Sequence, residues 1–251
     1  MQIKTDGLII RDLNVGEDDR IVTILSRERG VIGASARGAR RVKSRLSTAT
    51  RLFCYSDFTL FKGRDKYIID DAQPLEFFLG VDKDLERLAL AQYFAQVAAF
   101  LAPEEENAET YLRLMLNSLN FIKNGKRPPV QIKSVFELRI LTMAGYMPDI
   151  VACRNCGSYE ADVMNLDPIT GTLLCGDCAG QGGTMQNSIQ LSKGALAAMR
   201  HIVYSDFEKL FAFTLPGAAM KELSAASQAY LHSQIERSFP TLDFYNSIKK
   251  N

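Results

Sequence analysis

Two cysteine pairs carry the strongest chemical signal in the sequence. The first is Cys153 with Cys156 and the second is Cys175 with Cys178, and residues 157–174 separate them. Two C-x2-C pairs at this separation are typical of a zinc site. Four thiolates match the tetrahedral geometry of a structural Zn2+ ion and leave no open position for a water molecule. The sequence therefore predicts a structural zinc ribbon at about residues 151–183.

Two disulfides, or a redox-active CxxC motif, are the alternative interpretations of these cysteines. The chain begins with residues 1–6 (MQIKTD), which lack the apolar stretch of a signal peptide, so we expect a cytoplasmic protein. No run of apolar residues is long enough to cross a membrane. Gly157 and Gly176 are expected to give the backbone freedom that the cysteine turns need. The fifth cysteine, Cys54, is expected to be an inert thiol in the core.

Charge is distributed unevenly along the chain, although the formal net charge is only +1. The stretch from residue 29 to residue 51 has no acidic residue and contains these basic ones: Arg29, Arg37, Arg40, Arg41, Lys43, Arg45 and Arg51. Lys and Arg side chains on a loop bind the phosphates of nucleic acids without reading their sequence. The pattern favours a phosphate-binding loop, and a merely solvated surface is the alternative.

Motifs for catalysis are missing from the sequence. There is no GxxxxGK[ST] phosphate loop, and neither His201 nor His232 has a motif partner that would make it a general base. Acidic clusters at residues 17–19, 70–71 and 104–106 lack metal-ligand spacing. Two other classes stay open: a zinc-containing protein-interaction module without DNA binding, and a metal-dependent nuclease.

Residues 1–80 read as short strands separated by turns. The expected strands are residues 7–11, 20–25, 31–36, 52–61 and 66–69. Five short strands without a strong helix among them predict a small closed barrel, and the OB-fold is the five-stranded candidate. Such barrels often stack aromatic rings on the bases of single strands. The candidate rings are Phe53, Tyr55, Phe61 and Tyr67, with core packing as their alternative role.

Past residue 80 the apolar residues recur with the period of a helix. We expect helices at about residues 85–102, 108–123, 130–143, 192–202 and 220–237, followed by a polar tail. Asp82 and Ser192 are expected to cap the first and fourth of these helices. The fold class is therefore α+β. The expected domains are residues 1–80, an OB-fold, and residues 81–251, a helical domain that holds the zinc ribbon.

The N-terminal region resembles a known family. Residues 18–30 (DDRIVTILSRERG) and 36–46 (ARGARRVKSRL) closely resemble the RecO family of bacterial recombination mediators. The order of parts agrees over nearly the whole chain: barrel, helices, four-cysteine ribbon, helices. The resemblance implies an OB-fold that binds DNA and a helical domain that carries zinc.

The same resemblance implies a function in DNA repair and recombination through the RecF pathway, with no catalytic residues. The expected activities are binding of single- and double-stranded DNA, annealing of complementary strands, and help in loading RecA onto DNA covered by single-strand binding protein. The expected partners are RecR and the acidic C-terminal tail of single-strand binding protein, in the bacterial cytoplasm at the nucleoid. The residues carried over as phosphate contacts are Arg37, Arg40, Arg41, Lys43 and Arg45. The residues carried over as zinc ligands are Cys153, Cys156, Cys175 and Cys178.

Overall fold

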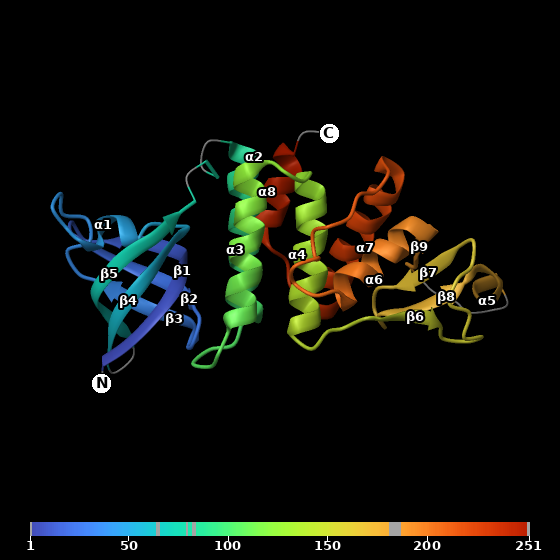
Figure 1. The fold of residues 1–251 in the computed structure, drawn as a ribbon, viewed down its shortest axis with the longest axis horizontal. Helices are drawn as coiled ribbons and strands as arrows, with labels where there is room; N and C mark the ends of the chain where they lie inside the picture. Colours follow the sequence, from blue (N-terminus) through green and yellow to red (C-terminus); the bar gives the residue numbers. More distant parts are fainter. Residues whose placement is uncertain (1, 64–65, 79, 82–83, 181–186, 250–251) are drawn as a thin grey trace. The chain divides into compact units, whose positions relative to one another are not determined.

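The protein, seen here as a computed structural model, is an α+β chain that forms two compact units (Figure 1). The structure describes residues 2–63, 66–78, 80–81, 84–180 and 187–249. The first unit comprises Met1–Lys126 and Phe239–Asn251, and the second comprises Arg127–Ser238. The α+β class predicted from the sequence is confirmed. The boundary expected at residue 80 stays a prediction.

The N-terminal strands close into a five-stranded barrel. They are β1 (Gln2–Val15), β2 (Asp19–Ser26), β3 (Gly30–Ala36), β4 (Cys54–Lys62) and β5 (Tyr67–Phe77), with the short helix α1 (Leu46–Ala49) between β3 and β4. Neighbouring strands follow the order β1-β2-β3-β5-β4, and β3 pairs with β5 in parallel while the other pairs are antiparallel. This confirms the five-stranded barrel expected of an OB-fold.

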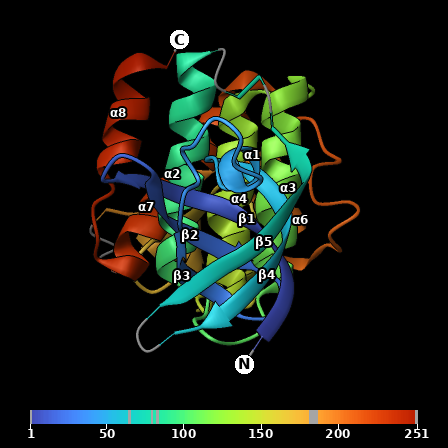
Figure 2. The same ribbon diagram turned by 90° about the vertical axis from the view of Figure 1, so that its left-hand side faces the viewer.

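The barrel core follows from the alternation of side chains along each strand. On β4 the buried residues are Cys54, Ser56, Phe58 and Leu60, so the thiol of Cys54 lies inside, as expected. The core is filled by aliphatic side chains such as Ile24 of β2, and α1 adds Leu46 and Ala49 to it. In Figure 2 the barrel is toward the viewer, and α1 lies against its strands.

Three helices complete the first unit. They are α2 (Leu85–Leu101), α3 (Glu109–Asn124) and α8 (Pro240–Ile248), and α2 packs against both of the others. The cap of α2 is Asp84, whose side chain accepts hydrogen bonds from the backbone N–H groups of Glu86 and Arg87. The expected cap, Asp82, lies outside the described residues.

The polar tail expected after the last predicted helix is wrong, because residues 240–248 form α8. Pro240 suits the first turn of a helix, where no N–H partner is needed. Leu242 and Tyr245 are buried, and the hydroxyl of Thr241 donates a hydrogen bond to Gln96 of α2. The C-terminal segment is therefore an integral part of the first unit.

The second unit combines helices with a small sheet. Its elements are α4 (Pro129–Met143), β6 (Asp149–Cys153), β7 (Met164–Asp167), β8 (Thr172–Cys175), α5 (Gly176–Gly180), β9 (Ile189–Leu191), α6 (Lys193–Tyr204) and α7 (Gly217–Ile235). Helix α4 packs against α6 and α7, and the sheet has the order β6-β8-β7-β9. The sheet extends beyond the ribbon predicted at about residues 151–183, because it also includes β9. Residues 181–183 of that prediction lie outside the described residues. As expected, Ser192 caps α6.

Helix α4 is buried on nearly all sides, as its sequence predicts, and it carries an ion pair inside the unit. Lys133 Nζ lies 2.8 Å from Glu137 Oε1, and both side chains are almost fully buried. Ser227 of α7 donates to Glu137 Oε2 at 2.7 Å. This hydrogen bond joins α4 to α7 through a buried polar contact. None of the helices described is long and apolar enough to cross a membrane.

Candidate nucleic-acid interface and metal centre

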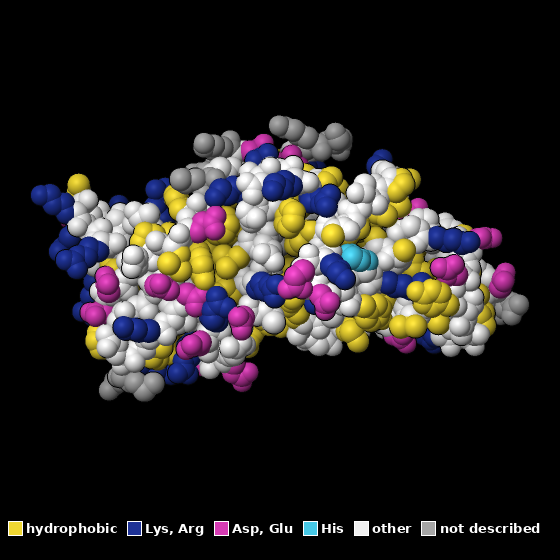
Figure 3. Space-filling model, in the orientation of Figure 1, with side chains coloured by type: hydrophobic (Ala, Val, Ile, Leu, Met, Phe, Trp, Pro, Cys, Tyr) yellow, Lys and Arg dark blue, Asp and Glu magenta, His cyan; other side chains and the backbone are white. Residues whose placement is uncertain are grey.

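Residues 37–45, which connect β3 to α1, form an exposed loop that we call the basic loop. All five of its cationic side chains are exposed: Arg37, Arg40, Arg41, Lys43 and Arg45. Figure 3 shows Lys and Arg side chains gathered at the end of the barrel where this loop and α1 lie. The structure therefore brings the five predicted residues together on one accessible surface. Their contact with phosphate stays a prediction.

The turn between β1 and β2 holds the backbone of the basic loop. The N–H of Arg40 donates to the carbonyl of Asp18 at 2.9 Å, and the N–H of Gly38 donates to Asp19 Oδ1 at 2.7 Å. Gly38 has a φ of +63°, a conformation that glycine adopts without strain. The guanidinium of Arg40 also donates to the carbonyl of Gly16 at 2.8 Å. The loop thus has a defined conformation set by a neighbouring hairpin.

The cations of the basic loop differ in their partners. Arg41 Nε donates to Asp18 Oδ2 at 2.8 Å, and this hydrogen bond raises the pKa of Arg41 above its ordinary value. In the part of the chain that the structure describes, the side chains of Arg37, Lys43 and Arg45 make no hydrogen bond or ion pair. Three cations are thus free to meet a polyanion.

The aromatic candidates for base stacking are mostly used elsewhere. Phe53 and Tyr67 are buried, each with about 4% of its surface exposed. The hydroxyl of Tyr55 donates to Asp6. Phe61, near the end of β4, is 41% exposed and is the most exposed of the four candidates. For Phe53 and Tyr67 the structure favours the alternative role in core packing.

The four predicted metal-ligating cysteines come together in the second unit. The Sγ atoms of Cys153, Cys156, Cys175 and Cys178 all lie within 4.8 Å of one another, and none of the chain's cysteines forms a disulfide. Around a tetrahedrally coordinated ion with metal–sulfur bonds of about 2.3 Å, the ligand sulfur atoms lie about 3.8 Å apart. The Cys156 and Cys175 Sγ atoms are 3.7 Å apart. The cluster therefore fits a tetrahedral metal ion.

Two short turns present these thiols. Cys153 ends β6, and the N–H of Gly157 donates back to the Cys153 carbonyl at 2.9 Å, with Gly157 at a φ of +71°. Gly157 therefore supplies the backbone freedom expected of it. Gly176 differs, because it begins α5 and its φ is not among the positive ones. Its N–H instead donates to the carbonyl of Val163 at 3.1 Å.

The surroundings of the cluster favour the thiolate form of Cys153 and oppose the thiolate form of Cys178. Burial raises the pKa of Cys153, but backbone N–H groups of Cys156, Cys175 and Asn155 donate to its sulfur and lower the pKa to about 6. Hydrogen bonds with Cys175 and Cys156 raise the pKa of Cys178 to about 12. Four thiolates at one point repel each other, so a bound cation is what would let all four ionise.

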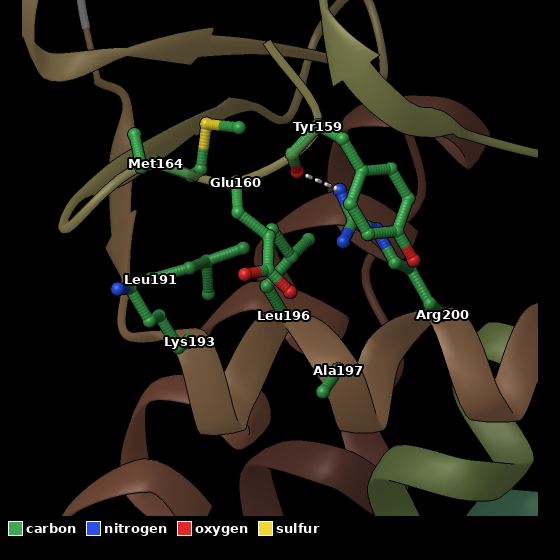
Figure 4. Close-up of a pocket in the computed structure, with 9 residues that line it drawn as sticks. Tyr159, Glu160, Met164, Leu191, Lys193, Leu196, Ala197 and Arg200 are labelled. Carbon is green, nitrogen blue, oxygen red and sulfur yellow. Dashed lines mark hydrogen bonds between the residues drawn. The ribbon is translucent and has the colours of Figure 1, made fainter.

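The ribbon is attached to α6 by Arg200. Its Nε donates to the Ile150 carbonyl at 2.8 Å, and one terminal nitrogen donates to the carbonyls of Val151 and Tyr159, each at 2.8 Å. The guanidinium also lies 4.0 Å from the centre of the Tyr159 ring. Figure 4 shows Arg200 beside Tyr159 at the rim of a pocket of about 140 Å3 between the ribbon and α6. One side chain thus joins two segments of the ribbon to a helix.

A second attachment comes from α7. Gln234 Nε2 donates to the carbonyls of Pro168 and Ile169, at 3.0 and 2.9 Å, in the turn between β7 and β8. In the same turn, Gly171 lies directly against the ring of Tyr230, and a side chain there would collide with it. The ribbon is therefore held to the helices at two separate places, by α6 through Arg200 and by α7 through Gln234.

Together these features define a class of protein: an OB-type barrel with an exposed basic loop, combined with a helical unit that carries a ribbon whose four cysteines could hold a metal ion. Comparison with known proteins gives the family. Residues 1–78 match the family model described as recombination protein O N terminal, and residues 82–243 match recombination protein O C terminal. The chain belongs to the RecO family of DNA repair proteins, which confirms the resemblance seen in its sequence.

Individual relatives match over nearly their full length. The DNA repair protein RecO of Acetivibrio thermocellus is 37% identical over 248 residues, which are 99% of this chain and 98% of that protein. The DNA repair protein RecO of Symbiobacterium thermophilum is 34% identical, over 97% of this chain and 96% of the relative. One from Dehalococcoides mccartyi is 29% identical over 98% of this chain and 96% of the relative.

Proposed function

We propose that this protein is a recombination mediator of the RecF pathway. It binds single- and double-stranded DNA, anneals complementary strands, and with RecR helps to load RecA onto DNA covered by single-strand binding protein. The acidic C-terminal tail of that protein is a further partner, and the place of action is the bacterial cytoplasm at the nucleoid. Family membership and the exposed basic loop support this proposal.

The basic loop carries the argument for DNA binding. The proposed phosphate contacts are Arg37, Arg40, Arg41, Lys43 and Arg45. Each phosphate that a cation neutralises releases counterions, so binding must weaken as salt rises, with a slope of about −0.7 per contact on single strands. Such contacts recognise the backbone and not the bases, which suits a protein that acts on DNA of any sequence.

Annealing follows from the same surface without covalent chemistry. Two complementary strands are polyanions that repel each other, and a cationic surface lowers that repulsion and raises the local concentration of both. The rate then depends on encounter and on pairing between the bases. The protein itself supplies a cationic surface that holds both strands close together, and it forms no covalent bond with them.

We further propose that the ion in the ribbon is Zn2+ and that its role is structural. Zinc favours four-coordinate tetrahedral sites with thiolate ligands, and the proposed ligands are Cys153, Cys156, Cys175 and Cys178. All four positions would be filled by sulfur, so no site for a substrate or a water molecule would be left on the metal. The ion would fix the two cysteine turns, and with them the sheet of the ribbon.

The test uses two free cations of the loop. In the variant Arg37→Gln with Arg45→Gln, affinity for a fluorescein-labelled single-stranded oligonucleotide should fall roughly tenfold or more, with a salt dependence shallower by about 0.7 per removed charge. Fluorescence anisotropy across a salt series measures both. The matched control, Lys209→Gln with Lys221→Gln, removes the same charge from exposed positions of the second unit and should bind like the wild type.

Three outcomes would contradict the proposal. Equal affinity of the loop variant and the wild type would remove the basic loop as the DNA site. No binding by the wild type at low salt would favour the protein-interaction module instead. Cleavage of the oligonucleotide in the presence of Mg2+, seen on a denaturing gel, would favour a nuclease.

A further inference from the structure

Residues 16–18 connect β1 to β2, and Asp19 is the first residue of β2. Residues 16–19 contain three consecutive acidic residues and touch the basic loop; we call them the acidic turn. Three contacts hold the loop without using the Asp18 side chain: Arg40 N–H to the Asp18 carbonyl, Gly38 N–H to Asp19 Oδ1, and the Arg40 guanidinium to the Gly16 carbonyl. Among the acidic side chains of the turn, Asp19 is the one that binds the loop backbone.

The carboxylate of Asp18 makes a different contact. It accepts a hydrogen bond from Arg41 Nε at 2.8 Å, and both side chains lie largely in solvent, with 46% of Asp18 and 68% of Arg41 exposed. A carboxylate and a DNA phosphate offer a guanidinium the same kind of charged oxygen acceptor. Asp18 therefore occupies Arg41 with a group that resembles the ligand of the basic loop.

We propose that the acidic turn adjusts the affinity of the basic loop for DNA. Asp19 is a positioning residue that fixes the loop backbone. Asp18 competes with DNA phosphate for Arg41, so that DNA must displace the Asp18 carboxylate before Arg41 contributes to binding. This inference rests on the proposed function, since it concerns the same DNA-binding loop.

Geometry separates the two acidic residues. Removing the Asp18 carboxylate leaves all three contacts to the loop in place, because the backbone carbonyl at position 18 remains. Removing the Asp19 carboxylate takes away the acceptor of the Gly38 N–H, which lies at the start of the loop in a left-handed conformation. Opposite effects on DNA binding therefore follow from neighbouring substitutions.

The first experiment is Asp18→Asn in the full-length protein, with a fluorescein-labelled oligothymidine as the probe. Affinity should rise about two- to fivefold, as expected for release of an exposed ion pair. The salt dependence should steepen by up to about 0.7, because Arg41 then meets a phosphate in every complex and not only in those in which DNA has displaced Asp18. In the background Arg41→Gln, the same Asp18→Asn change should leave both quantities unchanged, since the competition needs both partners.

The second experiment compares two substitutions of Asp19. Asp19→Ala should weaken oligothymidine binding, because the loop loses its hydrogen bond at Gly38. Asp19→Asn keeps an oxygen acceptor at that place and should bind at least as tightly as the wild type. Unchanged thermal melting of all variants would show that the affinity changes arise in the loop and not from loss of the barrel fold.

The proposal fails if Asp18→Asn leaves affinity unchanged or lowers it, or if the gain persists without Arg41. Its failure can be told from that of the proposed function. If the Arg37 and Arg45 variant weakens binding while Asp18→Asn does nothing, the basic loop binds DNA and only the competition is wrong. If the wild type does not bind the oligothymidine at low salt, both are wrong.

Discussion

Asp6 of β1 and Arg27, which follows β2, form a two-pronged ion pair on the barrel. Arg27 Nε donates to Asp6 Oδ1 at 2.8 Å, and a terminal nitrogen of Arg27 donates to Asp6 Oδ2 at 2.8 Å. The hydroxyl of Tyr55 in β4 also donates to Asp6, and Arg27 reaches Glu109 Oε1 in α3 at 2.7 Å. The pair of Asp6 and Arg27 thus joins two strands of the barrel, through Asp6, to a helix of the same unit, through Arg27.

This network predicts a pH-dependent part of the stability. Burial raises the pKa of Asp6, but the hydrogen bonds from Arg27 and Tyr55 outweigh it and hold the pKa below its ordinary value of 3.8. A carboxyl whose pKa is lower in the folded state stabilises the fold above the unfolded pKa, and this contribution disappears as the pH falls through the folded pKa. Asp6→Asn should therefore cost about 1 kcal/mol at pH 7 and almost nothing in strong acid.

Urea unfolding of the wild type and of Asp6→Asn at neutral pH and in strong acid measures that difference. The gap in unfolding free energy should close in acid, because the wild-type carboxyl is then protonated and no longer pairs with Arg27 as an anion. A gap of the same size at both pH values would show that Asp6 acts through packing and not through its charge.

At Gly30 we expect a single added methyl group to lower the stability of the fold strongly. It has a φ of +61°, and a Cβ at this position would lie 1.9 Å from the carbonyl oxygen of Pro103. Gly30→Ala should destabilise the protein by at least about 3 kcal/mol, since backbone strain adds to a collision with main chain. Gly33→Ala on the same strand is the control, because its Cβ meets nothing within 4 Å. Thermal unfolding compares the two, and equal melting temperatures would contradict the collision.

The features that the sequence could predict are those that nearby residues determine. The alternation of β4, the cap at Ser192 and the spacing of the four cysteines each lie within a short segment, and each agrees with the structure. The helix α8 was missed because only Leu242 and Tyr245 mark its buried face, and the helix that α8 packs against, α2, is distant in sequence. Local patterns cannot show such a partner.

The contacts of the candidate DNA site illustrate the same limit. The five cations of the basic loop stand out by composition, but the contact between Asp18 and Arg41 spans 23 positions in the sequence. From the sequence alone, the acidic turn is indistinguishable from a cluster of solvated charges. Its contacts with the basic loop are visible only in the structure. Likewise, Arg20 lies within the stretch that resembles the family, yet its guanidinium is used inside the protein, where it donates to Thr50 Oγ1 at 3.0 Å.

We expect Arg200 to be the main attachment of the ribbon to α6. Arg200→Ala removes the hydrogen bonds to three carbonyls and the contact with the Tyr159 ring, so the free energy of unfolding should fall by about 2 kcal/mol or more. Arg200→Lys should not restore it, because an ammonium group cannot reproduce the planar fork of the guanidinium. Hydrogen exchange should become faster at the ribbon amides in both variants.

The control for Arg200 is Arg154→Ala. Arg154 is an exposed arginine of the ribbon whose side chain makes one long hydrogen bond, 3.4 Å, to Thr172. Its removal should leave the exchange rates of the ribbon close to those of the wild type. If Arg154→Ala and Arg200→Ala accelerate exchange equally, Arg200 has no special part in attaching the ribbon.

The metal centre gives a prediction with two readouts. Cys153→Ser removes a buried cysteine of the proposed zinc site, the one whose sulfur accepts backbone hydrogen bonds. Bound zinc, measured by mass spectrometry of the metal, should therefore fall to background. Structural zinc contributes on the order of 10 kcal/mol to small ribbons, so the ribbon should unfold and its amides should exchange freely. The barrel in the other unit should keep its protected amides. Cys54→Ala, in the barrel core, is the control and should retain its zinc. If Cys153→Ser loses the metal while the melting temperature and ribbon protection stay unchanged, the ion does not have the structural role proposed for it.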